Sequence, residues 1–500
     1  MDSFVTTIAL VGIVVVVASL LSGAIERRGI PLVSVFLLLG AALGPWGLAI
    51  ADVGFHDPAL HALAMLGLAL LLFSDAVTLE TRQIRTQRAL LWRLLGPGTL
   101  APATISAVAA WLLLDLPAPA AAILGAALAS TDPVLLRTLL RSKALPDAPR
   151  LALRLETGMN DVVLLPIVIL SMLFLPGAYA PGGTAAIPTA TITHSILGLF
   201  VLGPLLGALV GWVGITALAS VREHTGVRRD YESLYALGLA FSAFAAAEAV
   251  GGSGFVAAFA AGLLVATNDI ELCDCFLEYG EATAEMLLML TFVALGTTLI
   301  WTGLTIIGWR TLLFAAIALG SRTAVLLPVL GGAGLSPRDR RLVALFGPRG
   351  LSSLLLALLP VFAGLPGAEQ VFQVTCLVVL LSVVIHGGGT AFFLRAGAAR
   401  ERSAGPMSSP GAEVLVPLRS AADESSMDGR LSAELITLAE LRLLQAMGEP
   451  TVIVDARAER SYLGDPLQPV GAVRVRPDDP ARDARALRLS TRANLIVYCA

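Results

Sequence analysis

A succession of long apolar segments is the feature that most constrains what this chain can fold into. A helix needs about 20 residues, at 1.5 Å each, to cross about 30 Å of hydrocarbon. The sequence offers a series of apolar segments of this length between clusters of glycine, proline and charged residues. We therefore predict an all-α polytopic membrane protein with about 13 transmembrane helices, at residues 4–25, 30–50, 59–79, 89–114, 119–140, 152–175, 190–220, 231–250, 252–268, 282–301, 305–330, 340–363 and 370–394.

The composition agrees with a membrane protein. Of the 500 residues, 56% are hydrophobic and only 14% are charged, whereas soluble domains carry about 25% charged residues. We expect the lipid bilayer as a partner, and neither a nucleic acid nor a cofactor. The cysteines are too few and too scattered for a disulfide framework, and they contain no second pair that would complete a zinc site; they are Cys273, Cys275, Cys376 and Cys499.

The distribution of basic residues predicts the orientation in the membrane. Arginine and lysine follow the first, third, fifth, seventh, eleventh and thirteenth predicted helices, whereas the loops at 51–58 and 176–188 contain none. Basic loops stay on the cytoplasmic side of a membrane. We therefore expect a multi-pass protein of the cell inner (plasma) membrane, with its N-terminus outside and its C-terminal region in the cytoplasm. The acidic loop at 269–281 departs from the pattern, but acidic residues contribute little to this rule.

The composition changes after the last apolar segment. We predict a membrane domain at 1–395 and a linker of small and polar residues at 396–430. Residues 431–500 contain two short β-branched runs of strand type, 451–457 and 494–500, and a segment of helical periodicity. The C-terminal region is therefore predicted to be a small α/β fragment.

Several ionisable residues lie inside the apolar segments. Each costs at least about 2.5 to 3.5 kcal/mol on insertion scales, so each is a functional candidate. The alternative is that a side chain near a helix end extends to water. That alternative applies most to Asp75 and Glu248, which we regard as possible accessory residues. The full set is Asp75, Asp132, Glu156, Asp161, Glu248, Arg322 and Arg349.

Two of these carboxylates occur five residues apart in one predicted helix. At 100° per residue, Glu156 and Asn160 share one face, whereas Thr157 and Asp161 share another. Glu156 can therefore face inward to meet an arginine, while Asp161, beside a hydroxyl, faces a hydrated cavity. A carboxylate with hydroxyl and carbonyl oxygens suits a hard monovalent cation, and a buried carboxylate without its cation takes a proton. A site that holds either a cation or a proton is the minimal chemistry of an exchanger.

Two further motifs predict interrupted helices. In "STDP" (130–133), Pro133 removes a backbone hydrogen bond and frees carbonyl groups that can coordinate an ion. In "GPRG" (347–350), the break carries a cation, Arg349. Interrupted helices at corresponding places in two halves indicate the binding site of a transporter. These two occupy the fifth position of the first and of the last six helices, which predicts two inverted six-helix repeats.

With these motifs, the first 395 or so residues resemble the monovalent cation:proton antiporters of the Na+/H+ exchanger type. The resemblance rests on "STDP", "ETGMND" (156–161), "GGSGFVAAFAAGLL" (251–264) and "GPRG". It implies a homodimer whose core domain moves against a dimerisation domain. It also implies a cation- and proton-binding site, in which Asn160 replaces a second aspartate and so points to electroneutral exchange, and an ion pair between Glu156 and Arg322, with Arg349 as the next candidate. The implied cation ligands are Asp161, Asp132, Thr131, Thr157 and Asn160.

The C-terminal region resembles a rhodanese-like domain. "VIVDAR", "QPVGAVRVRP" and "LIVYCA" carry the resemblance, which places Cys499 where that family has its reactive cysteine. Because only one residue follows Cys499, we expect the domain in this chain to be incomplete and without sulfurtransferase activity.

Three functions compete. We predict a secondary antiporter that exchanges Na+, K+ or Li+ for H+, and leave the choice of cation open. A membrane-tethered sulfurtransferase or sulfur sensor is the alternative, but it has no use for Asp132, Asp161 and Arg349 in broken helices. The third function is a channel. A carboxylate that switches between cation and proton suits alternating access better than a continuous pore.

Overall fold

The computed structural model divides into two compact units, Met1–Met407 and Ser408–Ala500. The residues that it describes are 12–14, 16, 17, 20, 32–79, 86–142, 145–175, 189–224, 229–268, 281–403, 441, 444, 447, 450–456, 469, 471–475, 480–487, 489 and 493–498.

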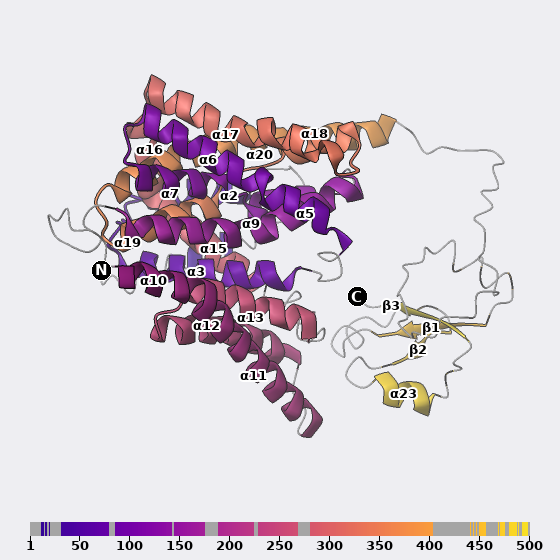
Figure 1. Cartoon of the computed structure of the whole chain (residues 1–500). Coiled ribbons are helices and arrows are strands. Elements are labelled where there is room, and N and C mark those ends of the chain that lie inside the picture. The colour runs from indigo at the N-terminus through magenta and orange to yellow at the C-terminus, as the bar shows by residue number, and fades with distance from the viewer. Residues whose placement is uncertain are drawn as a thin grey trace. The chain divides into compact units, whose positions relative to one another are not determined.

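The first unit is a bundle of helices (Figure 1). In chain order its elements are α2 (Leu32–Leu43), α3 (Pro58–Val77), α5 (Arg88–Leu95), α6 (Pro97–Leu113), α7 (Ala118–Ala129), α8 (Pro133–Arg141), α9 (Asp147–Leu173), α10 (Thr189–Leu197), η1 (Gly198–Leu202), α11 (Gly203–His224), α12 (Arg229–Ala249), α13 (Gly254–Asn268), α15 (Glu281–Thr297), η3 (Leu299–Trp301), α16 (Thr302–Thr305), α17 (Trp309–Val329), η4 (Leu330–Gly332), α18 (Pro337–Leu345), α19 (Leu351–Phe362) and α20 (Ala368–Ser403).

The chain is a multi-pass membrane protein. Among the described residues, seven helices are long and apolar enough to cross a bilayer, or eight if the pair bent by 58° at Thr298 is counted as one span. Other predicted spans coincide with apolar helices that are too short to cross alone, such as α2, α13 and α19. The first lies largely outside the described residues. The count of 13 and the inverted repeats therefore stay predictions.

Three of the described helices, α3, α8 and α18, begin with a capping side chain that is followed directly by proline. Asp57 accepts a hydrogen bond from the N–H of Ala59 (2.8 Å) at the start of α3, and Ser336 accepts one from Asp339 (3.1 Å) at the start of α18. The first N–H of a helix has no partner within the helix, so proline costs nothing there and its fixed φ favours the helix. These pairs fix where the helices start.

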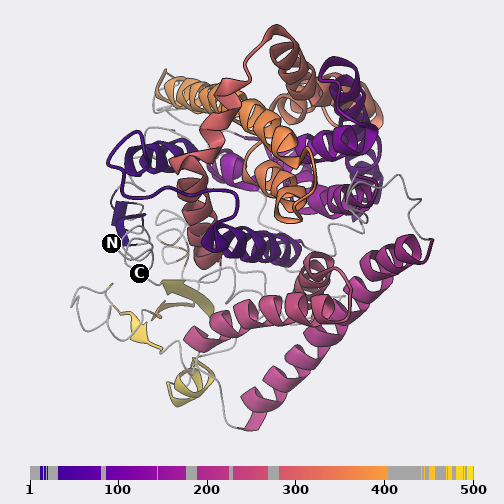
Figure 2. The ribbon, with the colours of Figure 1, turned by 90° about the vertical axis from the view of Figure 1, so that its left-hand side faces the viewer.

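The helices form two groups. The core group comprises α5–α9 and α17–α20, and the scaffold group comprises α2, α3, α10–α13 and α15; most contacts occur within each group. Figure 1 shows α10–α13 along the lower side and α6, α7 and α17 along the upper side. Viewed end-on in Figure 2, the long α10–α11 segment crosses at the edge of the bundle, away from α20. The groups meet mainly where α3 touches α9 and α19, with fewer contacts between α9 and α10 and between α2 and α8. The short η3 and α16, which follow α15, also touch α20.

Glycines allow close packing within the scaffold group. Gly203, Gly207 and Gly211 recur every four residues along α11 and lie against α13. A side chain at Gly207 would collide with the backbone of Ala257, so only glycine permits this approach. Small residues at such spacing are typical of helix contacts in membranes, where van der Waals packing replaces the hydrophobic effect.

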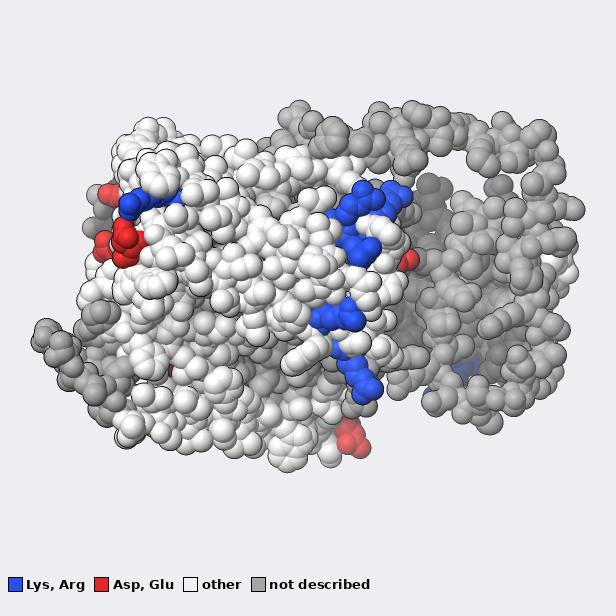
Figure 3. Space-filling view, turned by 45° about the horizontal axis from the view of Figure 1, so that its top comes forward, with Lys and Arg blue, Asp and Glu red and all other residues white. Residues whose placement is uncertain are grey.

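The charged surface residues lie at the two ends of the helices. Figure 3 shows arginine side chains gathered in a band at one end, a broad uncharged belt, and acidic side chains beside a basic one at the other end. Exposed arginines at the ends of α5 and α18 include Arg88, Arg338 and Arg341. At the start of α17, Arg310 pairs with the exposed Asp115 (2.8 Å). The belt has the polarity expected of a surface in hydrocarbon.

The second unit contains a three-stranded parallel sheet in the order β2-β1-β3, with a short helix α23 (Pro480–Ala486). Its strands are β1 (Thr451–Asp455), β2 (Val473–Arg474) and β3 (Asn494–Tyr498). The two strands predicted from sequence are confirmed. The fully buried Asp455 accepts a hydrogen bond from the hydroxyl of Tyr498 (2.7 Å). The predicted linker is mostly outside the described residues, although α20 continues to Ser403, past the boundary expected at 395.

Candidate functional site

Two interrupted helices meet inside the core group. The first interruption, residues 130–132, separates α7 from α8, and the second, residues 346–350, separates α18 from α19. The backbone N–H of Asp132 donates to the carbonyl of Pro348 (3.0 Å). Pro133 therefore does not kink a continuous helix. It starts a new one, after a stretch of extended backbone that pairs with the second break.

The Asp132 carboxylate joins the two breaks. One oxygen accepts from the N–H groups of Val134 (2.7 Å) and Leu135 (3.3 Å) at the start of α8, and the other accepts from the N–H of Leu351 at the start of α19. Helix N-termini carry partial positive charge, so one carboxylate neutralises two of them. The resemblance implied a cation ligand here. In the structure both oxygens accept from backbone donors, so Asp132 caps two helices, and its role as a cation ligand stays a prediction.

Both glycines of "GPRG" are required by close contacts. A side chain at Gly350 would collide with the Asp132 carboxylate, and one at Gly347 would lie within 2.6 Å of the Cδ atom of Arg322. A β-carbon almost never approaches another atom below 3.0 Å. Glycine at these two positions therefore lets the side chains of Asp132 and Arg322 lie directly against the backbone of the motif.

α9 brings its polar residues to the first break. The hydroxyl of Ser130 donates to Oδ1 of Asp161 (2.5 Å), and the amide of Asn160 donates to the hydroxyl of Thr131 (2.6 Å). All four side chains are buried. The structure thus brings together three predicted site residues, Thr131, Asn160 and Asp161, and adds Ser130, which the sequence analysis had not selected.

The buried oxygen atoms without a hydrogen-bond partner among the described residues include Oδ2 of Asp161, Oδ1 of Asn160 and Oγ of Ser352. Ser352 stands in the first turn of α19, close to the Asp161 carboxylate. Buried polar atoms normally have partners. A carboxylate, an amide oxygen and a hydroxyl form a donor set that suits a hard cation. Ser352 was also missed, although it follows "GPRG" by two residues.

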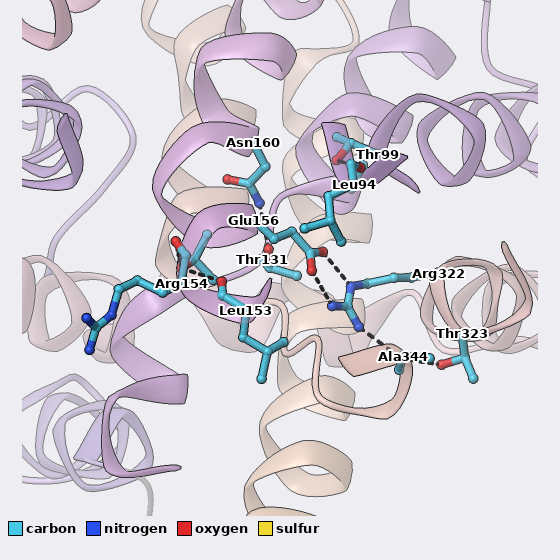
Figure 4. A network of polar contacts seen from close by, with 12 residues as sticks. Leu94, Thr99, Thr131, Leu153, Arg154, Glu156, Asn160, Arg322, Thr323 and Ala344 are labelled. Atoms are coloured by element: carbon cyan, nitrogen blue, oxygen red, sulfur yellow. Dashed lines mark hydrogen bonds and ion pairs between the residues drawn. The ribbon is translucent and has the colours of Figure 1, made fainter. Parts of the chain in front are cut away.

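Glu156 and Arg322 form a buried ion pair. Nε and Nη2 of Arg322 bond the two carboxylate oxygens at 2.8 and 2.6 Å, and the side chains are 3% and 4% exposed. Figure 4 shows Arg322 between Glu156 and the carbonyl of Ala344, to which Nη1 donates at 2.9 Å, while Arg154 points away from the pair. The pair ties α9 to α17 and to the end of α18. This is the pairing that the resemblance implied.

Arg349 has a different surrounding. Its Nη1 donates to the carbonyls of Ala129 (2.7 Å) and Ser130 (2.9 Å) at the end of α7, whereas its Nε and Nη2 have no partner among the described residues. A cation at a helix C-terminus satisfies the exposed carbonyls and the dipole. The carbonyls that the break frees, which we expected to coordinate an ion, are thus held by this guanidinium.

The other predicted residues lie apart from the Asp161 carboxylate or have other partners. Thr157 is buried, but its hydroxyl donates to the carbonyls of Leu153 (3.0 Å) and Arg154 (3.3 Å) in its own helix. Asp75 is buried in α3, with its backbone carbonyl facing Gly158.

Glu248 and the cysteines complete the predicted set. Glu248 caps α13 by accepting a hydrogen bond from the N–H of Gly254 (2.8 Å). It also lines a cavity of about 410 Å³, together with His61 and His194. Among the described residues, no cluster of three or more His, Cys, Asp or Glu side chains could hold a metal ion. Cys376 is buried and free, whereas Cys499 lies outside the described residues.

Comparison with known proteins gives a consistent result. The sequence profile of the transmembrane sodium/hydrogen exchanger family matches residues 12–396. A K+/H+ antiporter NhaP2 of Shewanella sp. strain ANA-3 is 27% identical over 381 residues, which cover 74% of this chain and 63% of the relative. A K+/H+ antiporter NhaP of Alkalimonas amylolytica is 24% identical over 394 residues, covering 77% and 66%. This chain thus spans less than two thirds of the length of these relatives.

The fold has a solved counterpart. The sodium proton antiporter MjNhaP1 from Methanocaldococcus jannaschii, determined at pH 8, superimposes with a TM-score of 0.62 at 20% identity, over 78% of this chain and 98% of that one. At this level of identity the likeness concerns the fold of the membrane unit.

Proposed function

Because this chain belongs to the transmembrane sodium/hydrogen exchanger family, we propose that it exchanges a monovalent cation for H+ across the plasma membrane. Na+, K+ and Li+ are the candidate cations. The observation that carries the proposal is the buried Asp161, whose Oδ2 has no partner among the described residues and whose carboxylate lies close to Ser352, where two interrupted helices meet. Its relatives are named as K+/H+ antiporters, which supports the reaction class.

Asp161 would carry either substrate. A carboxylate without a counter-charge in a buried site is costly, and a bound cation or a proton each removes that cost. Because the carboxylate carries a single negative charge, it does not hold the cation and the proton at once, so binding of one releases the other. Asn160 and the serine hydroxyls supply neutral oxygens, so one cation replaces one proton. That stoichiometry makes the exchange electroneutral.

The two helix groups provide a means of alternating access. The site lies within the core group, and that group meets the scaffold group through a limited set of contacts. A rigid movement of one group against the other would expose Asp161 to each side in turn. The ion pair between Glu156 and Arg322 lies wholly inside the core group, so it would keep the site intact during that movement.

The remaining features of the proposal concern assembly and orientation. We place the basic ends of α5 and α18 in the cytoplasm, which puts the N-terminus outside and the C-terminal unit inside. Thirteen spans in two inverted repeats and a homodimer complete the arrangement. The C-terminal unit, which is similar in sequence to rhodanese-like domains, would regulate or anchor the exchanger and take no part in ion binding.

The test is cation-dependent proton movement in vesicles that contain the full chain. Addition of Na+, K+ or Li+ in turn should dissipate a preformed pH gradient, as followed by dequenching of a pH-sensitive dye. Asp161→Asn keeps the shape of the side chain but carries neither charge nor proton, so this variant should be inactive at wild-type abundance. Asp115→Asn, in the exposed pair with Arg310, is the matched control and should remain active. Exchange by Asp161→Asn would refute the assignment.

A further inference from the structure

Two arginines from different helices lie against the same pair of glycines at one end of the core group. Gly331 and Gly332 end the short η4, which α5 and α18 both contact. A side chain added at Gly332 would lie 2.7 Å from Nη1 of Arg93, and one at Gly331 would lie 3.2 Å from Nη1 of Arg340. Because neighbouring Cα atoms are only about 3.8 Å apart, the two guanidinium groups meet at one short piece of backbone.

Among the described residues, no carboxylate pairs with either guanidinium. Arg93 makes one side-chain hydrogen bond, from Nη1 to the carbonyl of Val329 (3.1 Å), and Arg340 makes none; its Nε is buried without a partner. The one carboxylate of α18, Asp339, instead accepts from the hydroxyl of Ser336 (2.7 Å). Buried donors normally have a partner. The two arginines thus offer donors to an acceptor that no described residue supplies.

The ends of two spans set the depth of this site in the membrane. The candidate span Arg88–Leu113 begins within two turns of Arg93, and the candidate span Trp309–Gly332 ends at the site itself. Trp92, next to Arg93, is 76% exposed, and tryptophan is enriched where a membrane protein leaves the hydrocarbon. The site therefore lies at the level of the lipid headgroups.

The charge around the site favours an anion. α5 contains no acidic residue, and α18 contains three arginines for its one aspartate. Figure 3 shows the arginine band along the edge of the uncharged belt, at the end of the bundle where Figure 1 labels α5 and α18. A guanidinium binds two oxygens of a phosphate through parallel N–H donors. Two such groups over a backbone without side chains form a cradle of the right chemistry for a phosphate.

We propose that Arg93 and Arg340 bind the phosphate of an anionic lipid over the backbone of Gly331 and Gly332. A soluble phosphate has the same oxygens, but the exposed Trp92 and the ends of two spans place the site where lipid phosphates are concentrated. In the proposed orientation this is the cytoplasmic leaflet, whose surface is negative and attracts basic residues close to the membrane.

The bound lipid would stabilise the core group. Its phosphate would link α5, the end of α17 and α18. α17 carries Arg322, and α18 supplies the carbonyl of Ala344 to which Arg322 donates. A ligand that binds only the folded state raises the stability of that state. The lipid should therefore hold together the elements around the buried ion pair.

The test uses the purified full chain in a neutral detergent, to which phosphatidylglycerol or phosphatidylcholine with the same acyl chains is added. Native mass spectrometry measures the lipid that the chain retains, and thermal unfolding measures its stability. We expect phosphatidylglycerol to bind about tenfold more tightly than phosphatidylcholine, as one additional charge-assisted contact would give. Phosphatidylglycerol should also raise the unfolding midpoint of the wild type.

Arg340→Gln is the sharpest variant, because the Arg340 side chain makes no hydrogen bond to a described residue. Without lipid it should unfold at the wild-type temperature, yet it should bind phosphatidylglycerol about tenfold more weakly. Arg93→Gln should weaken binding by a similar factor. Arg338→Gln is the matched control, since it removes the same charge from α18 at about 200° around the helix from Arg340. It should bind the lipid as the wild type does.

Three results would overturn the proposal. The first is equal retention of the two lipids by the wild type. The second is equal weakening in Arg338→Gln and Arg340→Gln, which would indicate a general attraction between the basic surface and anionic lipid. The third is stabilisation by inorganic phosphate at the same concentration, which would assign the site to a soluble anion. None of these measurements involves transport, so they remain decisive if the proposed exchange function fails.

Discussion

Removal of one partner of the Glu156–Arg322 pair should destabilise the membrane unit strongly. Arg322 makes two bonds to the carboxylate, at 2.8 and 2.6 Å, and one to the carbonyl of Ala344, at 2.9 Å. Both side chains are at most 4% exposed, so Arg322→Ala leaves a carboxylate with neither water nor a counter-charge. Breaking a buried pair in this way costs about 3 to 5 kcal/mol. Glu156→Ala leaves the guanidinium in the same position and should cost a similar amount.

The double variant Glu156→Leu/Arg322→Met separates the cost of an unpaired charge from the loss of the pair. Replacing a buried pair with apolar side chains of similar volume is often neutral or stabilising. Thermal unfolding of purified protein, followed by intrinsic fluorescence, should therefore show midpoints lowered by several degrees for each single variant and a midpoint near that of the wild type for the double variant. Single variants that unfold at the wild-type temperature would refute the reasoning, because the pair would then contribute nothing to stability.

Three further predictions concern the ion site and the C-terminal unit. Ser352→Ala should raise the cation concentration needed for half-maximal exchange, because it removes an unpartnered oxygen close to the Asp161 carboxylate; an unchanged concentration dependence in vesicles would exclude Ser352 as a ligand. Arg349→Met should lower the unfolding temperature less than Arg322→Ala but exchange poorly, since it removes two hydrogen bonds at α7, of about 1 kcal/mol each, without leaving a charge unpaired; normal exchange would contradict this role. A chain that ends after Met407, the last residue of the first unit, should still exchange cations, with an altered pH profile as the sign of regulation; loss of exchange by correctly inserted protein would place the second unit in the transport machinery.

The sequence predicted the chemistry of the site better than its contacts. Periodicity and buried charge were sufficient to select α9, and the angle between Glu156 and Asp161 correctly gave the two carboxylates different partners. Proline and glycine located both helix interruptions. These are local properties, which follow from backbone geometry within one turn of a helix.

Contacts between distant segments could not be predicted in the same way. Nothing near Asp132 indicates that its second oxygen caps α19, because that N-terminus belongs to a segment far along the chain. For the same reason, the carbonyls freed at the first break were expected to face an ion, whereas Arg349 of the second break occupies them. Ser130 and Ser352 were missed because a serine gives no signal until its neighbours in space are known.

The count of transmembrane helices shows a related limit. Hydropathy marks apolar segments but not the length of regular helix within them. The interruption at 346–350 leaves α19 with 12 residues, too short to cross a bilayer alone, whereas the one at 130–132 lies inside a candidate span, Ala118–Arg137. Both interruptions contribute to the site, so the break that shortens α19 also supplies polar atoms that the site uses.

The most direct test of the central claim, that one carboxylate binds the cation and the proton in turn, is proton release on cation binding. Purified full-length protein in a weakly buffered solution receives Na+, K+ or Li+, and the protons released are measured against the amount of chain. We predict that a bound cation releases up to one proton per chain, that the apparent affinity for the cation rises with pH, and that Asp161→Asn releases none. Cation binding that releases no proton at any pH, or equal release from Asp161→Asn, would contradict the claim.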